Sequence, residues 1–446
     1  DEIVGASNQV WQLSGTNNEI KANEVTFTQV EKATNGTIVG TDEIDNFIIS
    51  DDANTDKQVT ANQILFSNIT SVKGGDATDT VSGSNTWNLL LEGFETSGIE
   101  FLDIVTANSA TAGTLNGTTE ANEFTLEGVQ SVATNGTTFN QVVTVNAKTG
   151  VHNKLVGMAG ADDFYLSSTN VVADINKVTS QGVDFNNITD INKVTSQGID
   201  FNNITDIDGD GGDNRVHGTA GIDSFQLTDK SQQLITNGMT FDNIQTVLAD
   251  SGEDNLVGQN NQAWQVSNAD NTIIAQGINF TQIESVSNEG TGSLMGSDQA
   301  DQFNLVSTNG TGVENAVIVN QLLFTNIGTI DAGDSSQDSS QGEDVVISDI
   351  EQTWQLTDDS SFSANGMLLS NIERATATSS IVMGSVSADV FETTDITNTV
   401  IANDVHFEHV TLIDGNEPGL TLTYSPELDA EQNNINNIDM VAAADK

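Results

Sequence analysis

The residues best suited to chemistry in this sequence are aspartates that recur at its glycine-rich turns. One such turn runs Lys73-Gly74-Gly75-Asp76-Ala77-Thr78-Asp79, and three others have a similar composition. Carboxylates gathered on a turn are hard oxygen ligands, which divalent cations prefer. The candidate ligands are Asp76, Asp79, Asp208, Asp210, Asp213, Asp223, Asp250, Asp254, Asp331 and Asp334. Because Asp, Asn and Gly are also ordinary turn residues, solvated turns without an ion are the alternative.

Residues for catalysis are sparse. The four histidines show no Ser-His-Asp spacing, and the sequence has no cysteine. A β-helical lyase acting on acidic polysaccharides needs basic residues to hold carboxylates. Arg215 and Arg374 are the only arginines, and the lysines are scattered singly. We therefore expect a protein that is not an enzyme.

Two recurring slots contain sixteen of the eighteen phenylalanines. The first slot reads Gly-x4-Asp-x-Phe and ends at Phe47, Phe124 (with Asn for Asp), Phe164, Phe225, Phe303 and Phe391. The second reads Asn-Gly-φ-x-Phe-x-Asn-Ile, where φ is apolar, and places its ring at Phe27, Phe66, Phe101, Phe139, Phe185, Phe201, Phe241, Phe280, Phe324 and Phe407, with Leu369 in one copy. Successive copies lie about forty residues apart, which indicates a solenoid or a propeller.

One short interval favours the solenoid. Residues 174–189 are repeated almost unchanged at 190–205, so Phe185 and Phe201 lie only 16 residues apart. A closed propeller blade could hardly absorb a duplicated strand, whereas an open stack accepts an extra turn of chain. We therefore expect an all-β, parallel β-solenoid (β-helix or β-roll type), with a coil of roughly 16 to 22 residues and about two coils in each repeat.

Local patterns agree with strands. In the segment 236–247, Met239, Phe241, Ile244 and Val247 fall on one side, with a corner at Asp242-Asn243. We expect the recurring corner asparagines, Asn68, Asn187, Asn203, Asn243, Asn326 and Asn371, to form a ladder that satisfies backbone groups. The four tryptophans replace the first-slot Phe, and we expect them in the core. A row of exposed rings that stacks on sugars is the alternative.

Several turns resemble the calcium-binding nonapeptide Gly-Gly-x-Gly-x-Asp-x-U-x, with U a large apolar residue, of repeats-in-toxin (RTX) proteins. The segments are GGDATDTVS at 74–82, SGEDNLVG at 251–258 and GTAGIDSFQ at 218–226. The resemblance covers about a third of each repeat. It implies a right-handed β-roll that binds Ca²⁺ between coils, with less than one ion per coil because most copies lack a glycine. The other halves resemble segments of giant secreted or surface-attached bacterial repeat proteins, including adhesins and biofilm matrix proteins.

The charge limits the partners. Sixty-four acidic and twelve basic residues give a formal net charge of −52. We therefore expect no nucleic acid partner and no binding to anionic membranes. No apolar run is long enough to span a membrane. The lack of cysteine suits a large exported bacterial protein. The first residues, Asp1-Glu2-Ile3-Val4-Gly5, match the middle of a repeat junction, so we expect the chain to extend upstream.

These observations predict one continuous solenoid of about ten repeats over residues 1–415, the first of them truncated at its start. Residues 416–446 diverge and are expected to form a cap, a linker or a subunit-joining segment. The expected function is an extracellular or cell-surface structural protein forming a stiff rod, as a filament or matrix subunit or as an adhesin shaft. The alternative is a carbohydrate- or surface-binding module on the same scaffold. Expected partners are further copies joined end to end, or a cell-surface or polysaccharide ligand.

Overall fold

The computed structural model describes residues 1–50, 57–166, 178–180, 183–185, 193–197, 199–306, 315–333, 342–357, 361–385, 389–394, 396–415, 421–423 and 439–441. Its regular structure is entirely β-strand over these residues. The chain forms two compact units. Unit 1 comprises residues 1–218 and 235–244, and unit 2 comprises residues 219–234 and 245–446.

The repeat around Trp264, in unit 2, contains five short strands. They are β29 (Asn255–Gly258), β30 (Ala263–Val266), β31 (Thr272–Ala275), β32 (Ile278–Thr281) and β33 (Ser285–Asn288). Side chains alternate between buried and outward positions along β29, β30, β32 and β33, as the period of two predicts. β30 and β31 pair antiparallel, and so do β31 and β32. β33 then returns to lie parallel to β29, which closes one turn of the solenoid.

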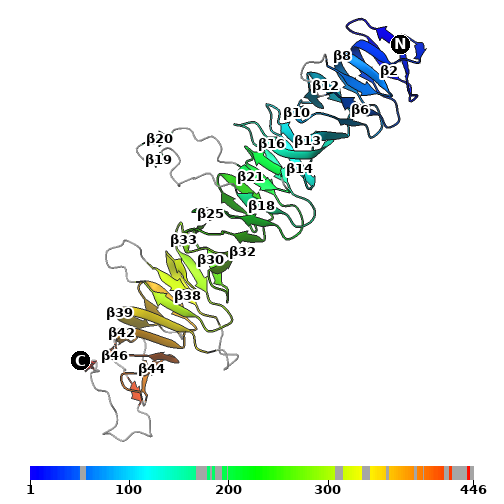
Figure 1. Cartoon of the computed structure of the whole chain (residues 1–446). Helices are drawn as coiled ribbons and strands as arrows, with labels where there is room; N and C mark the ends of the chain where they lie inside the picture. Colours follow the sequence, from blue (N-terminus) through cyan, green and yellow to red (C-terminus); the bar gives the residue numbers. More distant parts are fainter. Residues whose placement is uncertain are drawn as a thin grey trace. The chain divides into compact units, whose positions relative to one another are not determined.

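Parallel ladders connect successive coils. One ladder in unit 2 runs from β25 (Ser224–Leu227) through β29 and β33 to β37 (Leu322–Phe324). Its inward residues are Phe225, Leu256, Val286 and Phe324, all of which are buried. Figure 1 shows the same stacking for β39 (Val345–Leu356), β42 (Arg374–Met383) and β46 (Val410–Asp414), which pair in parallel. The predicted parallel β-solenoid is therefore confirmed.

The predicted coil length was wrong. Phe225 and Leu256 are direct parallel partners 31 residues apart, and Leu256 and Val286 are partners 30 residues apart. A coil therefore takes about thirty residues, and two coils do not fit into one repeat of about forty. Because one coil is shorter than one sequence repeat, the Phe of a slot does not stack on the Phe of the same slot in the next repeat. The ladder starts at a first-slot ring, Phe225, and ends at a second-slot ring, Phe324, with aliphatic residues between them.

The physical reason is a hairpin inside each coil. Gln276 and Gly277 join β31 to β32 with φ angles of 49° and 78°. Positive φ at both central residues is the signature of a type I′ turn, which joins antiparallel strands. The same pair of positive φ angles occurs at Asn23–Glu24, Asn62–Gln63, Ser97–Gly98, Asn135–Gly136, Asn237–Gly238, Asn320–Gln321, Asn365–Gly366 and Asn403–Asp404. The Asn-Gly of the second slot is thus a hairpin turn, and its Phe lies on the returning strand.

The duplicated segment behaves accordingly. Its second copy supplies β21 (Lys193–Ser196) and β22 (Ile199–Asn202), which pair with each other as the regular hairpin of unit 1. Its first copy supplies β19 (Val178–Ser180) and β20 (Val183–Phe185), which pair with each other in a separate two-stranded sheet. The expectation that the duplication adds a coil is therefore wrong. Each copy contains its own hairpin, so one of them closes on itself.

The core contains the rings predicted for it. Trp11, Trp87, Trp264 and Trp354 are at most 1% exposed, which confirms their place in the core. Each indole N–H finds a partner one coil on: Trp87 donates to Ser109 Oγ at 2.9 Å, and Trp264 donates to Asn288 Oδ1 at 3.0 Å. Met239, Phe241, Ile244 and Val247 are all buried, as the pattern of segment 236–247 predicted.

Parts of the divergent segment 416–446 continue the solenoid. β47 (Thr421–Thr423) pairs in parallel with β43 (Val390–Thr393). β48 (Asp439–Val441) pairs in parallel with β46. The other residues of this segment lie outside the described part of the chain.

Candidate functional site

The aspartate of the first slot caps its own loop. In unit 2, Asp223 Oδ2 accepts hydrogen bonds from the backbone N–H of Thr219 at 2.6 Å and from Thr219 Oγ1 at 3.0 Å. The side chains of Asp45, Asn122, Asp162, Asp301 and Asp389 accept the equivalent backbone bond. The slot begins with Gly because the next coil passes close by. A Cβ on Gly296 would collide with the carbonyl oxygen of Ala332. The Gly-x4-Asp spacing is therefore explained by local structure.

A second acidic residue, one coil later, accepts a hydrogen bond from the backbone N–H of the first. The backbone N–H of Asp223 donates to Asp254 Oδ1 at 2.7 Å, and the backbone N–H of Asp254 donates to Glu284 Oε2 at 2.7 Å. Asp45 donates in the same way to Asp79 Oδ1 at 2.8 Å. Acidic side chains therefore form columns that cross successive coils. Sequence reasoning identified Asp79, Asp223 and Asp254 but missed Asp45 and Glu284.

Other copies have asparagine in place of this second acid, and they show what the position requires. Asp162 donates its backbone N–H to Asn214 Oδ1 at 2.9 Å. The Asn214 Nδ2 then donates to the carbonyl oxygen of Asn243 at 2.9 Å. Asn153 uses its two amide atoms in the same way, toward Asn122 and Asn203. The side chain at this position therefore needs one acceptor atom, for a backbone N–H of the previous coil. It also needs one donor atom, for a carbonyl oxygen at the corner of the next coil.

An ionised aspartate has no donor for that corner. Asp79 and Asp254 are completely buried, and within the described residues the Oδ2 of each has no hydrogen-bond partner. At Gly74 a Cβ would meet both Asp79 Oδ2 and the carbonyl oxygen of Asp103. At Gly209 it would meet the corresponding pair, Asn214 Nδ2 and the carbonyl oxygen of Asn243. Asp79 Oδ2 therefore lies near the carbonyl oxygen of Asp103, in the place where Asn214 has an amide N–H donor. Only a proton or a cation would make this contact favourable.

Burial raises the pKa of these carboxyls. The pKa of Asp254 rises to about 6, first because burial disfavours the charged form and then because Asp223, Glu284 and Asp250 are negative neighbours. Burial also raises the pKa of Asp79, with Asp45 and Asp103 as further causes. A protonated Oδ2 in either residue would supply the donor that Asn214 supplies in its own copy.

Two other predicted ligands belong to the coil corners. Asp208 Oδ1 accepts from Asn243 Nδ2 at 2.6 Å, and Asp208 Oδ2 accepts from Lys154 Nζ at 3.1 Å. These bonds, with one from the backbone of Asp210, lower the pKa of Asp208 although its burial acts to raise it. Asp331 Oδ1 likewise accepts from Asn371 Nδ2 at 2.7 Å. Both carboxylates already hold protein donors.

Four of the remaining predicted ligands are solvent-facing. Asp76, Asp210, Asp213 and Asp250 are exposed. Asp334 lies outside the described residues. Where the structure describes the chain, no three histidine, aspartate or glutamate side chains are grouped so that they could hold a metal ion. The structure brings Asp223 to Asp254 and Asp210 to Asp208, each through a backbone N–H.

The role predicted for the recurring corner asparagines is confirmed only in part: Asn203 and Asn326 donate to backbone carbonyl oxygens, whereas Asn68, Asn243 and Asn371 donate to side chains. Asn68, Asn203, Asn243, Asn326 and Asn371 all have φ angles between 54° and 61°, a region that asparagine tolerates better than most residues. Their side chains bond to the preceding coil, as Asn326 does to the carbonyl oxygen of Asn288 at 3.0 Å. Asn187 lies outside the described residues. A true amide ladder, Asn88–Asn116–Asn146–Asn202, occurs elsewhere in unit 1 and was not predicted.

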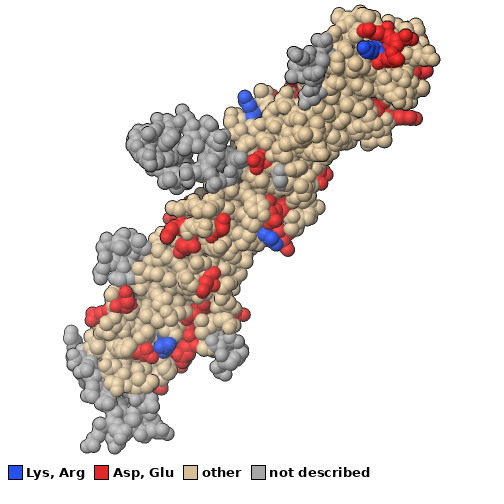
Figure 2. Space-filling model, in the orientation of Figure 1, with Lys and Arg blue, Asp and Glu red and all other residues tan. Residues whose placement is uncertain are grey.

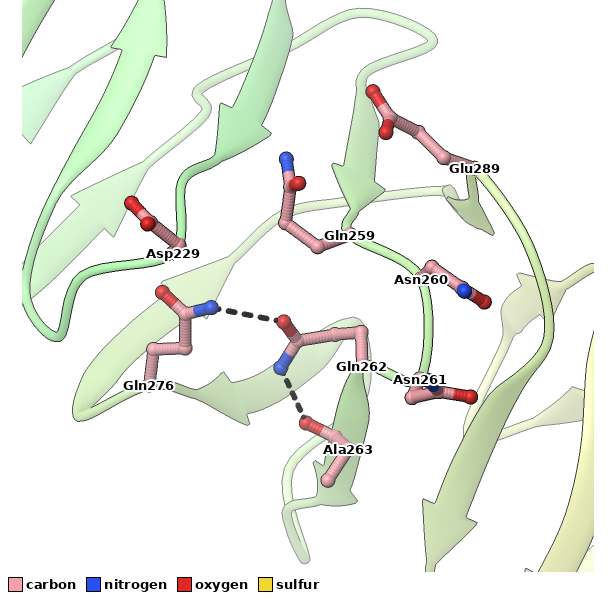
Figure 3. A pocket seen from close by; sticks show the side chains of 8 residues that line it. All are labelled: Asp229, Gln259, Asn260, Asn261, Gln262, Ala263, Gln276 and Glu289. Atoms are coloured by element: carbon pink, nitrogen blue, oxygen red, sulfur yellow. Dashed lines mark hydrogen bonds between the residues drawn. The ribbon is translucent and has the colours of Figure 1, made fainter.

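A groove in unit 2 is lined mainly by amide and carboxylate side chains. It has a volume of about 510 Å³ and lies beside the turn at residues 259–262. Figure 3 shows Asp229 and Gln276 on one side of it and Glu289 on the other, with Gln259 between them. Gln276 Nε2 donates to Gln262 Oε1 at 3.0 Å, whereas Gln276 Oε1 is buried and has no partner among the described residues.

The visible face of each unit has scattered acidic side chains and few basic ones, as Figure 2 shows. This distribution agrees with the net charge of −52, which has no single acidic tail as its source. No helix with the length and apolar character needed to cross a membrane occurs in the part of the chain that the structure describes. Comparison with known proteins adds no relative: no family model matches the chain, and no curated protein sequence matches it significantly.

Proposed function

We propose that this chain is an extracellular structural repeat protein that forms a stiff rod. It acts as the subunit of a filament or matrix, or as the shaft of a giant adhesin. The observation that carries this proposal is the continuity of bonding between coils. Within each unit, parallel ladders join one coil to the next, and the loops are joined as well, through contacts such as Asp223 N–H to Asp254 Oδ1.

Such bonding suits a mechanical role. Each coil contacts mainly its neighbours, so stiffness depends on the coil-to-coil contacts and length depends on the number of repeats. The hairpins also bond to each other across coils: Asn320 Nδ2 donates to the carbonyl oxygen of Ser267 at 2.7 Å, and Asn403 Nδ2 donates to that of Thr357 at 3.2 Å. Hydrogen bonds at both the strands and the hairpins resist sliding of one coil over another.

The extracellular location and calcium are part of the same proposal. They rest on the absence of cysteine, the net charge of −52 and the resemblance of the acidic turns to RTX repeats. Counter-ions would relieve the self-repulsion of such a chain. The exposed carboxylates Asp76, Asp210, Asp213 and Asp250 are the most accessible to them. No catalytic residue belongs to this proposal.

Electron microscopy of the purified chain tests the rod and the filament separately. Long fibres of constant width support a filament subunit, because the chain then assembles end to end. Monodisperse rods of one length support the shaft of a longer polypeptide. Compact particles without an elongated axis contradict both forms of the proposal. Small-angle scattering at several concentrations provides a control, because assembly depends on concentration and the shape of a single chain does not.

A further inference from the structure

The groove of unit 2 has features that a structural role does not require. Its walls come from successive coils: Asp229 follows β25, Gln259 follows β29, Gln276 begins the β31–β32 hairpin turn, and Glu289 follows β33. A second hollow of about 450 Å³ lies beside it and has Ala263 and Gln276 among its lining residues as well. Volumes of this size suit small-molecule ligands.

The walls are held in place before any ligand arrives. Gln262 is only 7% exposed, and its Nε2 donates to the carbonyl oxygen of Ala263 at 2.8 Å. Gln276 Nε2 donates to the carbonyl oxygen of Thr228 at 2.8 Å as well as to Gln262. Gln259 Nε2 donates to the carbonyl oxygen of Leu227 at 2.8 Å. Fixed walls lower the entropy that binding would cost.

These bonds use amide donors and leave acceptors in the groove. The carboxylates of Asp229 and Glu289 are exposed, and Gln276 Oε1 is buried in the wall without a partner among the described residues. Among the residues that the structure describes, no lysine or arginine lines either hollow. A matching ligand therefore supplies hydrogen-bond donors and has no negative charge. Sugar hydroxyls do this, and they also accept from amides such as those of Asn260 and Asn261.

The second hollow adds an apolar surface. Ile274 and Met295, which line it, are 39% and 49% exposed. Apolar side chains beside a polar groove suit the C–H face of a pyranose ring, whose hydroxyls point toward the polar side. No exposed aromatic ring lines the groove, so stacking does not strengthen the contact, and we expect a dissociation constant on the order of 1 mM.

We propose that this groove binds a neutral oligosaccharide, with the exposed carboxylates of Asp229 and Glu289 as acceptors for its hydroxyl groups. The proposal goes beyond the structural role and does not depend on it. One residue of the groove is not specific to it: Gln9 and Gln352 precede other tryptophans and make the same bond to the next carbonyl oxygen as Gln262. Gln262 is therefore part of the repeat, whereas the exposed carboxylates of Asp229 and Glu289 form the recognition surface.

The test titrates the full chain with maltotriose, cellotriose and chitotriose, monitored by calorimetry or ligand-observed NMR. Glucuronic acid serves as an anionic probe and calcium chloride as a cationic one. The expected result is saturable binding of at least one neutral trisaccharide and none of glucuronic acid. Asp229→Ala combined with Glu289→Ala should weaken binding at least tenfold. These side chains are exposed, so the fold should persist, which the unchanged melting temperature verifies.

Glu253→Ala is the matched control, because it removes an exposed acid of the same unit outside the groove. This variant should bind like the parent chain. The proposal is overturned if no neutral sugar binds up to roughly 50 mM, if only calcium binds, or if the double variant keeps its full affinity. Any of these results would leave the proposed structural role untouched, because that role depends on contacts between coils.

Discussion

The backbone N–H of Asp223 donates a 2.7 Å hydrogen bond to Oδ1 of Asp254, a completely buried acid one coil later. This bond ties two coils together, but it leaves Asp254 Oδ2 buried without a partner among the described residues. In the related position of unit 1, Asn214 makes both contacts with its amide. Asp254 and Asn214 therefore show an acid and an amide in the same structural role within one chain.

Replacing the buried acid with its amide should stabilise the protein. We predict that Asp254→Asn raises the free energy of unfolding at pH 8 by about 1 to 2 kcal/mol, because the new Nδ2 donor satisfies the corner and the buried charge is removed. Asp79→Asn should act in the same direction. The melting temperatures of the variants and the parent chain, measured by circular dichroism, give the comparison.

Two controls accompany this measurement. Asp250→Asn removes an exposed charge near the same turn and should change stability by less than Asp254→Asn. The reverse change, Asn214→Asp, should destabilise unit 1 at pH 8. If Asp254→Asn lowered the melting temperature instead, the carboxylate would be holding a cation, and a proton at this position would be the wrong interpretation.

The raised pKa values predict a pH dependence. Asp254 has a folded-state pKa of about 6, above its ordinary value of 3.8, because of burial and then its negative neighbours. The folded state therefore holds this proton more tightly than the unfolded state. The stabilisation is fully present below pH 3.8 and is lost as the pH rises through about 6. Asp79, Asp162, Asp223 and Asp301 are shifted in the same direction, mainly by burial.

Unfolding in urea at pH 5 and at pH 8 should therefore give the lower free energy of unfolding at pH 8. The contribution of Asp254 to this difference should be roughly 1 kcal/mol, because its folded-state pKa of about 6 lies about one unit above the lower pH. Asp208 and Asp298, whose pKa values are lowered, lose their contribution only at more acidic pH. The Asp79→Asn, Asp254→Asn double variant should show a smaller difference between the two pH values. An unchanged difference would show that other groups cause the dependence.

Calcium removal is a separate test. If calcium binds the acidic turns, exhaustive chelation should lower the melting temperature, and metal analysis should find less than one ion per coil. Repeating the chelation on Asp254→Asn locates the ion. An equal loss in the variant and the parent places calcium at exposed carboxylates such as Asp250. Melting that is unchanged by chelation would contradict the calcium part of the proposal.

The sequence predicted the strands but not the length of the coil. Alternation in the segment 236–247 identified its four buried residues, because period-two burial is a local property. The predicted coil length was wrong because it rested on the 16-residue interval of the duplicated segment, whose two copies are two hairpins and not two coils. Asn-Gly between alternating apolar residues is a strong hairpin signal, and using it would have doubled the expected coil.

The candidate site was predictable only in part, for a related reason. Asp250 and Asp254 belong to one acidic turn, yet one is exposed and the other is completely buried. Their difference depends on which residue of the preceding coil faces them, and this follows only from the coil length. One local signal was available: Asp79, Asn153, Asn214 and Asp254 each lie two residues before the inward residue of a strand.

The core rings should differ in their contribution according to the coils around them. Phe241 is completely buried and packs edge to face against Phe164, with ring centroids 6.3 Å apart. Phe241→Ala should cost about 3 to 5 kcal/mol. Phe27 occupies the same slot in the first repeat but is only half-buried, so Phe27→Ala should cost clearly less. Denaturant unfolding of both variants compares them, and equal losses would contradict this view of the core.

The last prediction concerns the hairpin turn. Gly136 has a φ of +76°, and no atom lies within 4 Å of the place where its Cβ would be. Gly136→Ala therefore isolates backbone strain in the turn and should cost about 1 kcal/mol. Gly160 is equally open but has no positive φ, so Gly160→Ala is the matched control and should be neutral or slightly stabilising. Hydrogen exchange of β15 (Ser131–Thr134) and β16 (Thr137–Asn146), which flank Gly136, should increase only in Gly136→Ala. Equal effects of the two substitutions would mean that the left-handed turn does not determine the hairpin, and the account of the coil length would lose its basis.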